Sequence, residues 1–274
     1  MPIAYMQKER YTIEDLLEIM RLLRSPEGCH WDREQTHQSI RSNFLEETHE
    51  VIEAINRNDA DLLCEELGDV LLQIVFHTQM ESEKKSFGFE DVVDGICKKL
   101  IVRHPHVFAD VKADDTNQIL KNWDMIKRET KGGKTQADLL KAVPKSLPAL
   151  MRSAKVQNRA ARLGFDWPEV SGALQALENE KIELERAIDS GDPALMEEEL
   201  GDVLFSAVNV SRFIGCDAEQ ALTVSCDKFI RRFSVVESIA GQQGVDMTKA
   251  SLEKLDELWS MAKSLSDAGC SENP

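Results

Sequence analysis

Apolar residues recur along most of the chain at the three- and four-residue spacing of amphipathic helices, and we find no alternating stretch typical of a strand. The pattern therefore predicts an all-α protein. Turn residues separate the helices, as in Gly191-Asp192-Pro193, where Asp is typical of a helix N-cap and Pro of the first helical position. The expected helices cover residues 12–24, 39–56, 60–82, 89–103, 116–130, 146–162, 171–189, 193–214, 217–240 and 251–265.

An internal repeat of acidic segments organises the chain into two halves. The segment Glu65-Glu66-Leu67-Gly68-Asp69-Val70-Leu71 recurs at residues 198–204, and Glu47-x-x-Glu50 recurs at residues 180–183. Both recur at an offset of 133 residues, which also relates Asp59 to Asp192. We therefore predict a duplication, with an N-terminal repeat at 1–130, a polar, Gly-containing linker at 131–145 and a C-terminal repeat at 146–274.

In each repeat the acids flank the turn of an expected helical hairpin. In the second repeat, Glu180 and Glu183 precede Asp192 by 12 and 9 residues, and Glu199 and Asp202 follow it by 7 and 10. At about 1.5 Å of rise per residue, all four lie roughly 10–18 Å from the turn. The i, i+3 spacing places each pair on one helix face. Four carboxylates are thus expected to converge at one level of the hairpin.

The first repeat is expected to bring together Glu47, Glu50, Glu66 and Asp69 in the same way. Such a group of negative charges is costly unless a cation offsets it. Mg²⁺ prefers oxygen ligands and keeps positions for water and phosphate. We therefore predict a Mg²⁺ site in each repeat. The alternative is a solvated acidic face, which accounts less well for the duplication and for the symmetric placement about the turn.

Other residues near the hairpins are candidates for substrate contacts. Trp259 could stack on a base, with a core position as the alternative. Gly68 and Gly201 lie inside expected helices, where Gly costs about 1 kcal/mol relative to Ala. Either a neighbouring helix or ligand approaches closely there, or a small residue is merely tolerated. Basic residues that follow each hairpin could hold phosphate oxygens or form a solvated basic face: Lys99 and Arg103 in the first half, Lys228, Arg231 and Arg232 in the second.

The formal net charge of −16 argues against binding of nucleic-acid polymers or anionic membranes, because both need basic surface. Nucleotides remain possible ligands when metal ions supply positive charge. The six cysteines show neither a C-x-x-C pair nor zinc spacing, so we expect reduced thiols. The N-terminal stretch lacks the apolar run of a signal peptide, and no stretch approaches about 18 apolar residues. The expected location is cytoplasmic, without a membrane segment.

Two other patterns that resemble metal sites carry less weight. Glu46-x-x-His49 matches the ligand spacing of di-iron helical bundles. Asn179 and Ile182 stand at the corresponding positions of the second half, so the pattern is not repeated. The segment His104-Pro105-His106 has no partner cluster and favours a structural turn.

Taken together, these segments resemble the MazG family of nucleoside triphosphate pyrophosphohydrolases over nearly the whole chain. An E-x-x-E and an E-x-x-D pair separated by a short spacer is the hallmark of this all-α superfamily, which includes dimeric dUTPases and phosphoribosyl-ATP pyrophosphatases. The two-repeat layout is specific to the long MazG type. The resemblance rests on Leu45-Glu46-Glu47-Thr48-x-Glu50-Val51, both Glu-Leu-Gly-Asp segments, Arg103-His104-Pro105-His106-Val107-Phe108, Ser146-Leu147-Pro148-Ala149-Leu150-Met151 and Gly164-Phe165-Asp166-Trp167.

The resemblance implies tandem repeats, similar to four-helix bundles, that are completed by dimerisation. It implies Mg²⁺-dependent hydrolysis of (deoxy)nucleoside triphosphates to the monophosphate and pyrophosphate, with broad specificity and a housekeeping role. It also favours the C-terminal half as the main active unit. By the same resemblance, the Mg²⁺ ligands are Glu47, Glu50, Glu66 and Asp69 in the first half and Glu180, Glu183, Glu199 and Asp202 in the second, with phosphate contacts from Lys228, Arg231 and Arg232 and a base near Trp259.

The candidate catalytic residues are Glu180, Glu198 and Glu199, and Glu198 or Glu180 would accept a proton from the attacking water. Asn179 precedes Glu180 where the family often has a second acid, and His30 stands where Pro is common, which are the two departures from the family pattern. Three alternatives stay open. They are a narrow-specificity enzyme such as a dUTPase, a non-catalytic helical dimer that binds metal or nucleotide for regulation, and an oxidative di-iron bundle.

Overall fold

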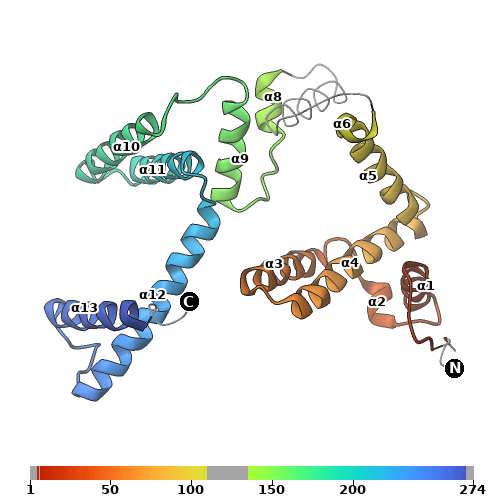
Figure 1. The fold of residues 1–274 in the computed structure, drawn as a ribbon, viewed down its shortest axis with the longest axis horizontal. Coiled ribbons are helices and arrows are strands. Elements are labelled where there is room, and N and C mark those ends of the chain that lie inside the picture. Colours follow the sequence, from red (N-terminus) through yellow and green to blue (C-terminus); the bar gives the residue numbers. More distant parts are fainter. Residues whose placement is uncertain (1–4, 6, 110–134, 270–274) are drawn as a thin grey trace. The chain divides into compact units, whose positions relative to one another are not determined.

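The computed structural model describes residue 5 and residues 7–109 and 135–269. Within these ranges every regular element is a helix, which confirms the all-α prediction. The chain divides into two compact units, residues 1–132 and 133–274 (Figure 1). The segment expected to be a linker, 131–145, includes the short helix α8 (Gln136–Lys141), which belongs to the second unit.

The two units have their helices in a similar order. The first contains α1 (Ile13–Leu23), α2 (His30–Glu34), α3 (Arg41–Arg57), α4 (Ala60–Glu83), α5 (Phe89–Arg103) and α6 (Pro105–Phe108). Besides α8, the second contains α9 (Ala149–Ala161), α10 (Val170–Ser190), α11 (Pro193–Phe213), α12 (Ala218–Gln243) and α13 (Leu252–Gly269). The predicted helix 116–130 lies outside the described residues.

The long helices lie close to their expected positions, whereas the short ones were not predicted. Helices α2, α6 and α8 have 5, 4 and 6 residues, and such lengths are too short to show a helical period. Helix α12 continues three residues beyond its expected end at 240. It ends where Gly244 takes a left-handed conformation with φ of 65°, which a glycine adopts without steric cost.

The core of the first unit lies mainly between α1 and the C-terminal half of α4. Met20, Ile40, Val75, Phe76 and Met80 are buried against one another there. Because α4 buries this half against α1, its N-terminal half is left to pack along α3. Glu66 and Asp69 of α4 lie in that N-terminal half.

The second unit has a buried cluster between α12 and α13, and a separate hairpin of α10 and α11. The α12–α13 cluster consists of Val236, Ile239, Ala240, Leu258 and Ala262. Helix α9 packs against α11 as α1 packs against α4 in the first unit. The helices of the described ranges are all too short or too polar to cross a lipid bilayer.

Candidate metal centre

Each acidic hairpin turns at a pair of capping residues. Helix α10 ends at Gly191 in the left-handed region (φ 72°), and the Asp192 side chain caps α11 by accepting a hydrogen bond from a backbone amide of its first turn. In the first unit, Asn58 takes the left-handed position (φ 54°) and Asp59 caps α4 in the same way. The turn predicted from the Gly-Asp-Pro sequence is thus confirmed, and the first unit makes it with Asn in place of Gly.

Three carboxylates meet between the helices of the second hairpin. Glu180 comes from α10, and Glu199 and Asp202 come from α11, which packs alongside α10. One oxygen of each carboxylate lies within 4.8 Å of an oxygen of each of the other two. Glu183, the fourth predicted ligand, is exposed and lies outside this set.

The first hairpin repeats this arrangement. Glu47 on α3 meets Glu66 and Asp69 on α4, with one oxygen from each again within 4.8 Å of the others. Glu50 is exposed and lies outside the set, as its counterpart does in the second unit. Three of the four acids therefore converge in each unit, at equivalent positions of the two repeats.

In the second cluster, the carboxylates lie close enough for their negative charges to repel one another. Desolvation raises the pKa of Glu180 above its usual value, and the charges of Asp202, Glu183 and Glu199 raise it further. Desolvation also raises the pKa of Glu199, followed by the charges of Glu183, Asp202 and Glu198. Glu183 therefore takes part in the electrostatics of the cluster although it is not among the three closest acids.

In the first cluster the causes are the same. Desolvation raises the pKa of Glu47, followed by the charge of Asp69 and then by the charge and a hydrogen bond of Glu50. The pKa of Glu66 is raised by desolvation and then by the charges of Glu50 and Asp69. A divalent cation among these oxygens would relieve the repulsion, and a donor set made only of carboxylate oxygens suits a hard ion such as Mg²⁺.

We expect the substitution Glu180→Gln to raise the melting temperature of the metal-free protein, by a gain that grows as the pH rises. Folding raises the pKa of this carboxyl group, so its contribution to the stability of the folded state is fully present below the usual pKa of 4.5. That stabilisation is lost as the pH rises through the raised pKa. The gain over wild type should be small near pH 4 and larger near pH 7. Thermal scans with and without Mg²⁺ test this, because Mg²⁺ should stabilise wild type more than the variant. An equal gain at both pH values would contradict the electrostatic cause.

The basic residues predicted to contact phosphate lie on the helix that follows each acidic hairpin. Helix α12 carries Lys228, Arg231 and Arg232 and contacts α11, while α5 carries Lys99 and Arg103 and contacts α4. Lys228, Arg231 and Lys99 are exposed, and Arg232 and Arg103 are partly buried. In both units, then, the basic helix directly follows, and contacts, the helix that supplies two of the three clustered carboxylates. Their role toward phosphate stays a prediction.

Trp259 lies within the packing of α13 on α12. It is partly buried against the α12–α13 cluster, and its ring centroid lies 5.2 Å from that of Phe229 on α12. Within the chain, Trp259 therefore makes the contacts expected of a residue at the edge of the core. Contact with a base stays a prediction.

Gly68 and Gly201 face open space. A Cβ added at either position would meet no heavy atom within 4 Å among the described residues. Within the described part of the chain, no neighbouring helix therefore approaches these glycines closely, although the sequence suggested such an approach as one reason for them. Each glycine directly precedes a clustered aspartate, so the backbone beside each cluster stays open.

The sequence did not single out the residues of a cavity beside the second cluster. They come from α9, from the loop 164–167 and from α11, and include Gln157, Asn209 and Arg212. The available signal was the segment Gly164-Phe165-Asp166-Trp167, which the sequence offered only as a mark of family resemblance.

These features define an all-α protein in which one acidic hairpin site occurs twice. Residues 35–108 and 169–236 match the MazG nucleotide pyrophosphohydrolase domain, and the matched ranges contain both acidic hairpins. The chain belongs to the MazG family.

Two relatives align with nearly the whole chain. It is 45% identical over 256 residues to a nucleoside triphosphate pyrophosphohydrolase of Escherichia coli (strain K12), which covers 92% of this chain and 97% of that protein. It is 43% identical over 258 residues to the nucleoside triphosphate pyrophosphohydrolase/pyrophosphatase MazG of Thermotoga maritima, covering 94% and 98%. A nucleoside triphosphate pyrophosphohydrolase of Mycolicibacterium smegmatis is 38% identical over 149 residues, covering 54% and 46%.

Proposed function

We propose that this chain hydrolyses nucleoside triphosphates of the ribo and deoxy series to the monophosphate and pyrophosphate, with Mg²⁺ as cofactor. The observation that carries the proposal is the convergence of three carboxylates in each hairpin of a MazG family chain. Two relatives that align over almost their whole length bear the name nucleoside triphosphate pyrophosphohydrolase. Broad specificity, a housekeeping role in the nucleotide pool and a leading role for the second unit are parts of the proposal.

The donor set fits Mg²⁺, since every clustered atom is a carboxylate oxygen. The fourth acid of each unit, Glu50 or Glu183, is exposed, and its side chain would complete the set of ligands. When bound, the ion would supply positive charge to phosphate oxygens and lower the pKa of a water molecule. The proposed ligands are Glu180, Glu183, Glu199 and Asp202 in the second unit and Glu47, Glu50, Glu66 and Asp69 in the first.

The chain's own residues would then move the proton and hold the phosphates. Glu180 or Glu198 would accept the proton of the attacking water. Glu180 is buried enough for its pKa to be raised, which makes it more basic than an ordinary glutamate. Glu198 is exposed beside Glu199 on α11, from where it could pass a proton to solvent. The basic side chains of α12 and α5 would neutralise the phosphate oxygens that face away from the carboxylates.

We include a homodimer in the proposal because two of the helices present apolar side chains to solvent. Soluble monomers rarely expose large contiguous apolar surface. A second copy of the chain packed on α5 and α12 would cover these residues and bring basic side chains of the same helices close to an acidic hairpin. The exposed apolar residues are Val92, Val93, Ile96, Leu100 and Ile101 on α5 and Leu222, Val224, Phe229, Ile230 and Phe233 on α12.

Product analysis with a panel of ribo- and deoxynucleoside triphosphates tests the proposed reaction. We expect the monophosphate and pyrophosphate in equal amounts, no orthophosphate, and no turnover when EDTA removes Mg²⁺. Turnover of a single nucleotide would indicate the narrow, dUTPase-like alternative. Nucleotide binding without pyrophosphate release would indicate a regulatory binding protein. Bound iron with visible absorbance would indicate a di-iron protein and overturn the proposal.

A further inference from the structure

Residues 29–40 of the first unit form a segment, the strap, that contains α2 and leads from the turn after α1 into α3. Ile40, at the end of the strap, is 3% exposed and packs in the core of the first unit with Val75 and Phe76 of α4. Polar side chains connect the strap to α4 at two further points. One lies in the middle of the strap and the other lies just before Ile40.

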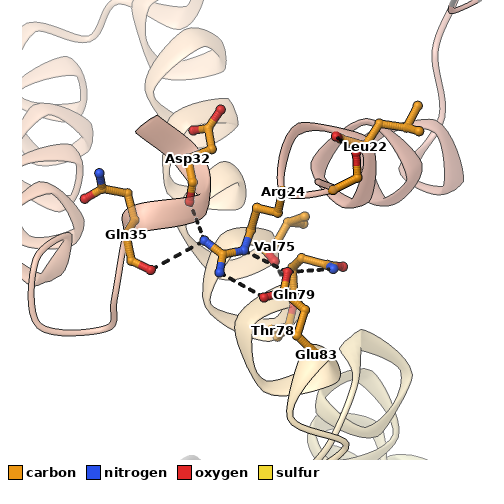
Figure 2. Close-up of polar contacts among 9 residues, drawn as sticks. Leu22, Arg24, Asp32, Gln35, Val75, Thr78, Gln79 and Glu83 are labelled. Carbon is orange, nitrogen blue, oxygen red and sulfur yellow. Dashed lines mark hydrogen bonds and ion pairs between the residues drawn. The ribbon is translucent and has the colours of Figure 1, made fainter. Parts of the chain in front are cut away.

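The first connection is made by Arg24, which follows α1. Its guanidinium donates hydrogen bonds to the backbone carbonyls of Asp32 and Gln35 in the strap, and it pairs with Glu83 of α4 at 2.8 and 2.9 Å (Figure 2). The side chain of Arg24 is 7% exposed. The hydrogen bond from Arg24 lowers the pKa of Glu83, and arginine keeps its charge near neutral pH. This connection is therefore expected to persist between about pH 5 and pH 8.

The second connection is a histidine pair, His37 of the strap and His77 of α4. Their rings are nearly parallel, with 7° between the planes, and their Nδ1 atoms lie 2.7 Å apart. The other ring nitrogen of His37, Nε2, lies 2.6 Å from Oε1 of Glu81. Two ring nitrogens can share a hydrogen bond only while one carries a proton and the other does not. The connection therefore requires that one imidazole of the pair stays neutral.

The groups around the histidine pair confine its titration to the imidazoles. Hydrogen bonds from Lys84, His37 and Ser86 lower the pKa of Glu81 to about 2, so Glu81 keeps its negative charge at mildly acidic pH. On α3, the ring that faces His77 is that of Phe44, whose centroid lies 5.9 Å away and which carries no charge. Any proton taken up here between about pH 7 and pH 5 therefore goes to a ring nitrogen.

The other helices packed on α4 bring their charges elsewhere. Arg24, beside α1, is paired with Glu83. The acids near the start of α5, Glu90 and Asp91, lie beside a different part of the α4 surface. The histidine pair is thus surrounded by Glu81 and Lys84 as its charged neighbours on α4, with Lys84 2.7 Å from Glu81.

The second repeat has a different set of residues at these positions. All six histidines of the chain lie between residues 30 and 106, within the first unit. At the offset of 133 residues, the positions of His37, His77 and Glu81 are taken by apolar residues, which have no titratable group: Val170, Val210 and Ile214. A response to pH that depends on this connection is therefore a property of the first repeat.

We propose that acidification releases the strap locally, at the end that the histidine pair holds. At neutral pH, one proton between His37 and His77 joins the strap to α4. Once both imidazoles are protonated, the hydrogen bond is lost and two positive charges meet, so residues 36–40 detach while Arg24 still holds the middle of the strap. The released end leads directly into α3, which carries Glu47 of the first cluster. The release does not depend on the proposed reaction.

The size of the response follows from proton linkage. Burial lowers the pKa of His77 below its usual value of 6.5, and the charge of His37 lowers it further. The closed strap is therefore fully favoured above pH 6.5 and loses stability as the pH falls toward the lowered pKa, because the open strap binds a proton that the closed strap does not. Between pH 7.5 and pH 5.5, one such proton changes the ratio of closed to open strap by up to about tenfold.

Hydrogen exchange of single amides, measured by NMR in EDTA and expressed as protection relative to the unfolded chain, tests the release. The amides of Ile40 and Phe44 donate to backbone carbonyls at the end that should detach, at 3.3 and 3.2 Å. The amide of Cys29 donates to the carbonyl of Leu23 over 2.7 Å at the other end of the strap. From pH 7.5 to pH 5.5, protection of Ile40 and Phe44 should fall by about five- to tenfold, and that of Cys29 by less than about twofold.

Two variants assign the response to the histidine pair. In His77→Asn, an amide group takes the place of Nδ1 and can donate or accept a hydrogen bond without titrating. Protection of Ile40 should then stay at its wild-type level at pH 7.5 and change by less than about twofold at pH 5.5. His30→Gln removes an exposed histidine of the same strap, which lies 3.4 Å from Glu34, and is the matched control. It should show the full wild-type fall.

A fall that persists in His77→Asn would overturn the proposal, as would a wild-type fall of less than about twofold. Equal losses at Ile40 and Cys29 would also overturn it, because the whole strap would then open. Should His77→Asn fail to fold, the imidazole signals of the wild type decide. His77 must take up its proton at a lower pH than His30, together with the loss of Ile40 protection, and uptake at the same or a higher pH rejects the release.

Discussion

Replacing Asp202 by Ala should lower kcat for nucleoside triphosphates by roughly two to three orders of magnitude, whereas Asp69→Ala should leave most of the turnover intact. Asp202 supplies one of three converging oxygens in the second cluster, and the loss of a ligand that fixes a catalytic ion removes several kcal/mol of transition-state stabilisation. The first repeat has an equivalent cluster, but the proposed function gives the leading role to the second unit. Comparison of the two aspartates therefore assigns turnover to one repeat.

Steady-state kinetics at several Mg²⁺ concentrations, with pyrophosphate release as the readout, measures this difference. Asp189→Ala serves as the matched control, since Asp189 is an exposed acid on α10 outside the cluster. Its kcat should stay within about twofold of wild type. Near-normal kcat in Asp202→Ala, or an equal loss in Asp69→Ala, would show that the second cluster is not the principal catalyst.

The largest expected loss of stability follows from Leu258→Ala. Leu258 is fully buried between α12 and α13, and truncation of such a side chain costs about 2–5 kcal/mol of the free energy of unfolding. Leu252 lies on the same helix and is 71% exposed, so Leu252→Ala should change the free energy of unfolding by about 0.5 kcal/mol or less. Both substitutions remove the same atoms, and only burial distinguishes them.

Hydrogen exchange of the amides of α12 and α13, together with denaturant titration, separates the two variants. A chain of two compact units need not unfold in one step, so the loss should be confined to the second unit. Protection of α3 and α4 should stay at its wild-type level. Equal protection of α13 in Leu258→Ala and Leu252→Ala would contradict the burial of Leu258 between α12 and α13.

The acidic hairpins could be predicted from the sequence because every feature that defines them is local. The Glu180, Glu199 and Asp202 positions follow from helix spacing counted from one turn, and Gly191-Asp192-Pro193 marks that turn. The repeat at a constant offset then supported the same reading in the first half. Glu183 could not be separated from the other three acids in this way, since spacing fixes the face of a helix but not the distance between side chains.

The cavity beside the second cluster could not be predicted, because it depends on how separate elements pack. Gln157 comes from α9, Phe165 from a loop and Asn209 from α11, and no periodicity relates these three positions. The repeat offset aligns Asn209 with Phe76 in the sequence. The effect of that difference depends on the neighbours of each side chain in the fold. Trp259 illustrates the same limit, since its position near the end of the chain did not reveal its packing against Phe229.

The carboxylates and the cavity stand on one uninterrupted helix, and this restricts how the family can vary. Insertion of a single residue between Asp202 and Phe205 would turn every later side chain by about 100° and move it about 1.5 Å along the axis. The cavity wall would then face away from the acids. A flexible loop between the acids and the cavity would tolerate such an insertion. Here, the cavity wall and the acids can change relative to one another only by exchanges of side chain at fixed positions.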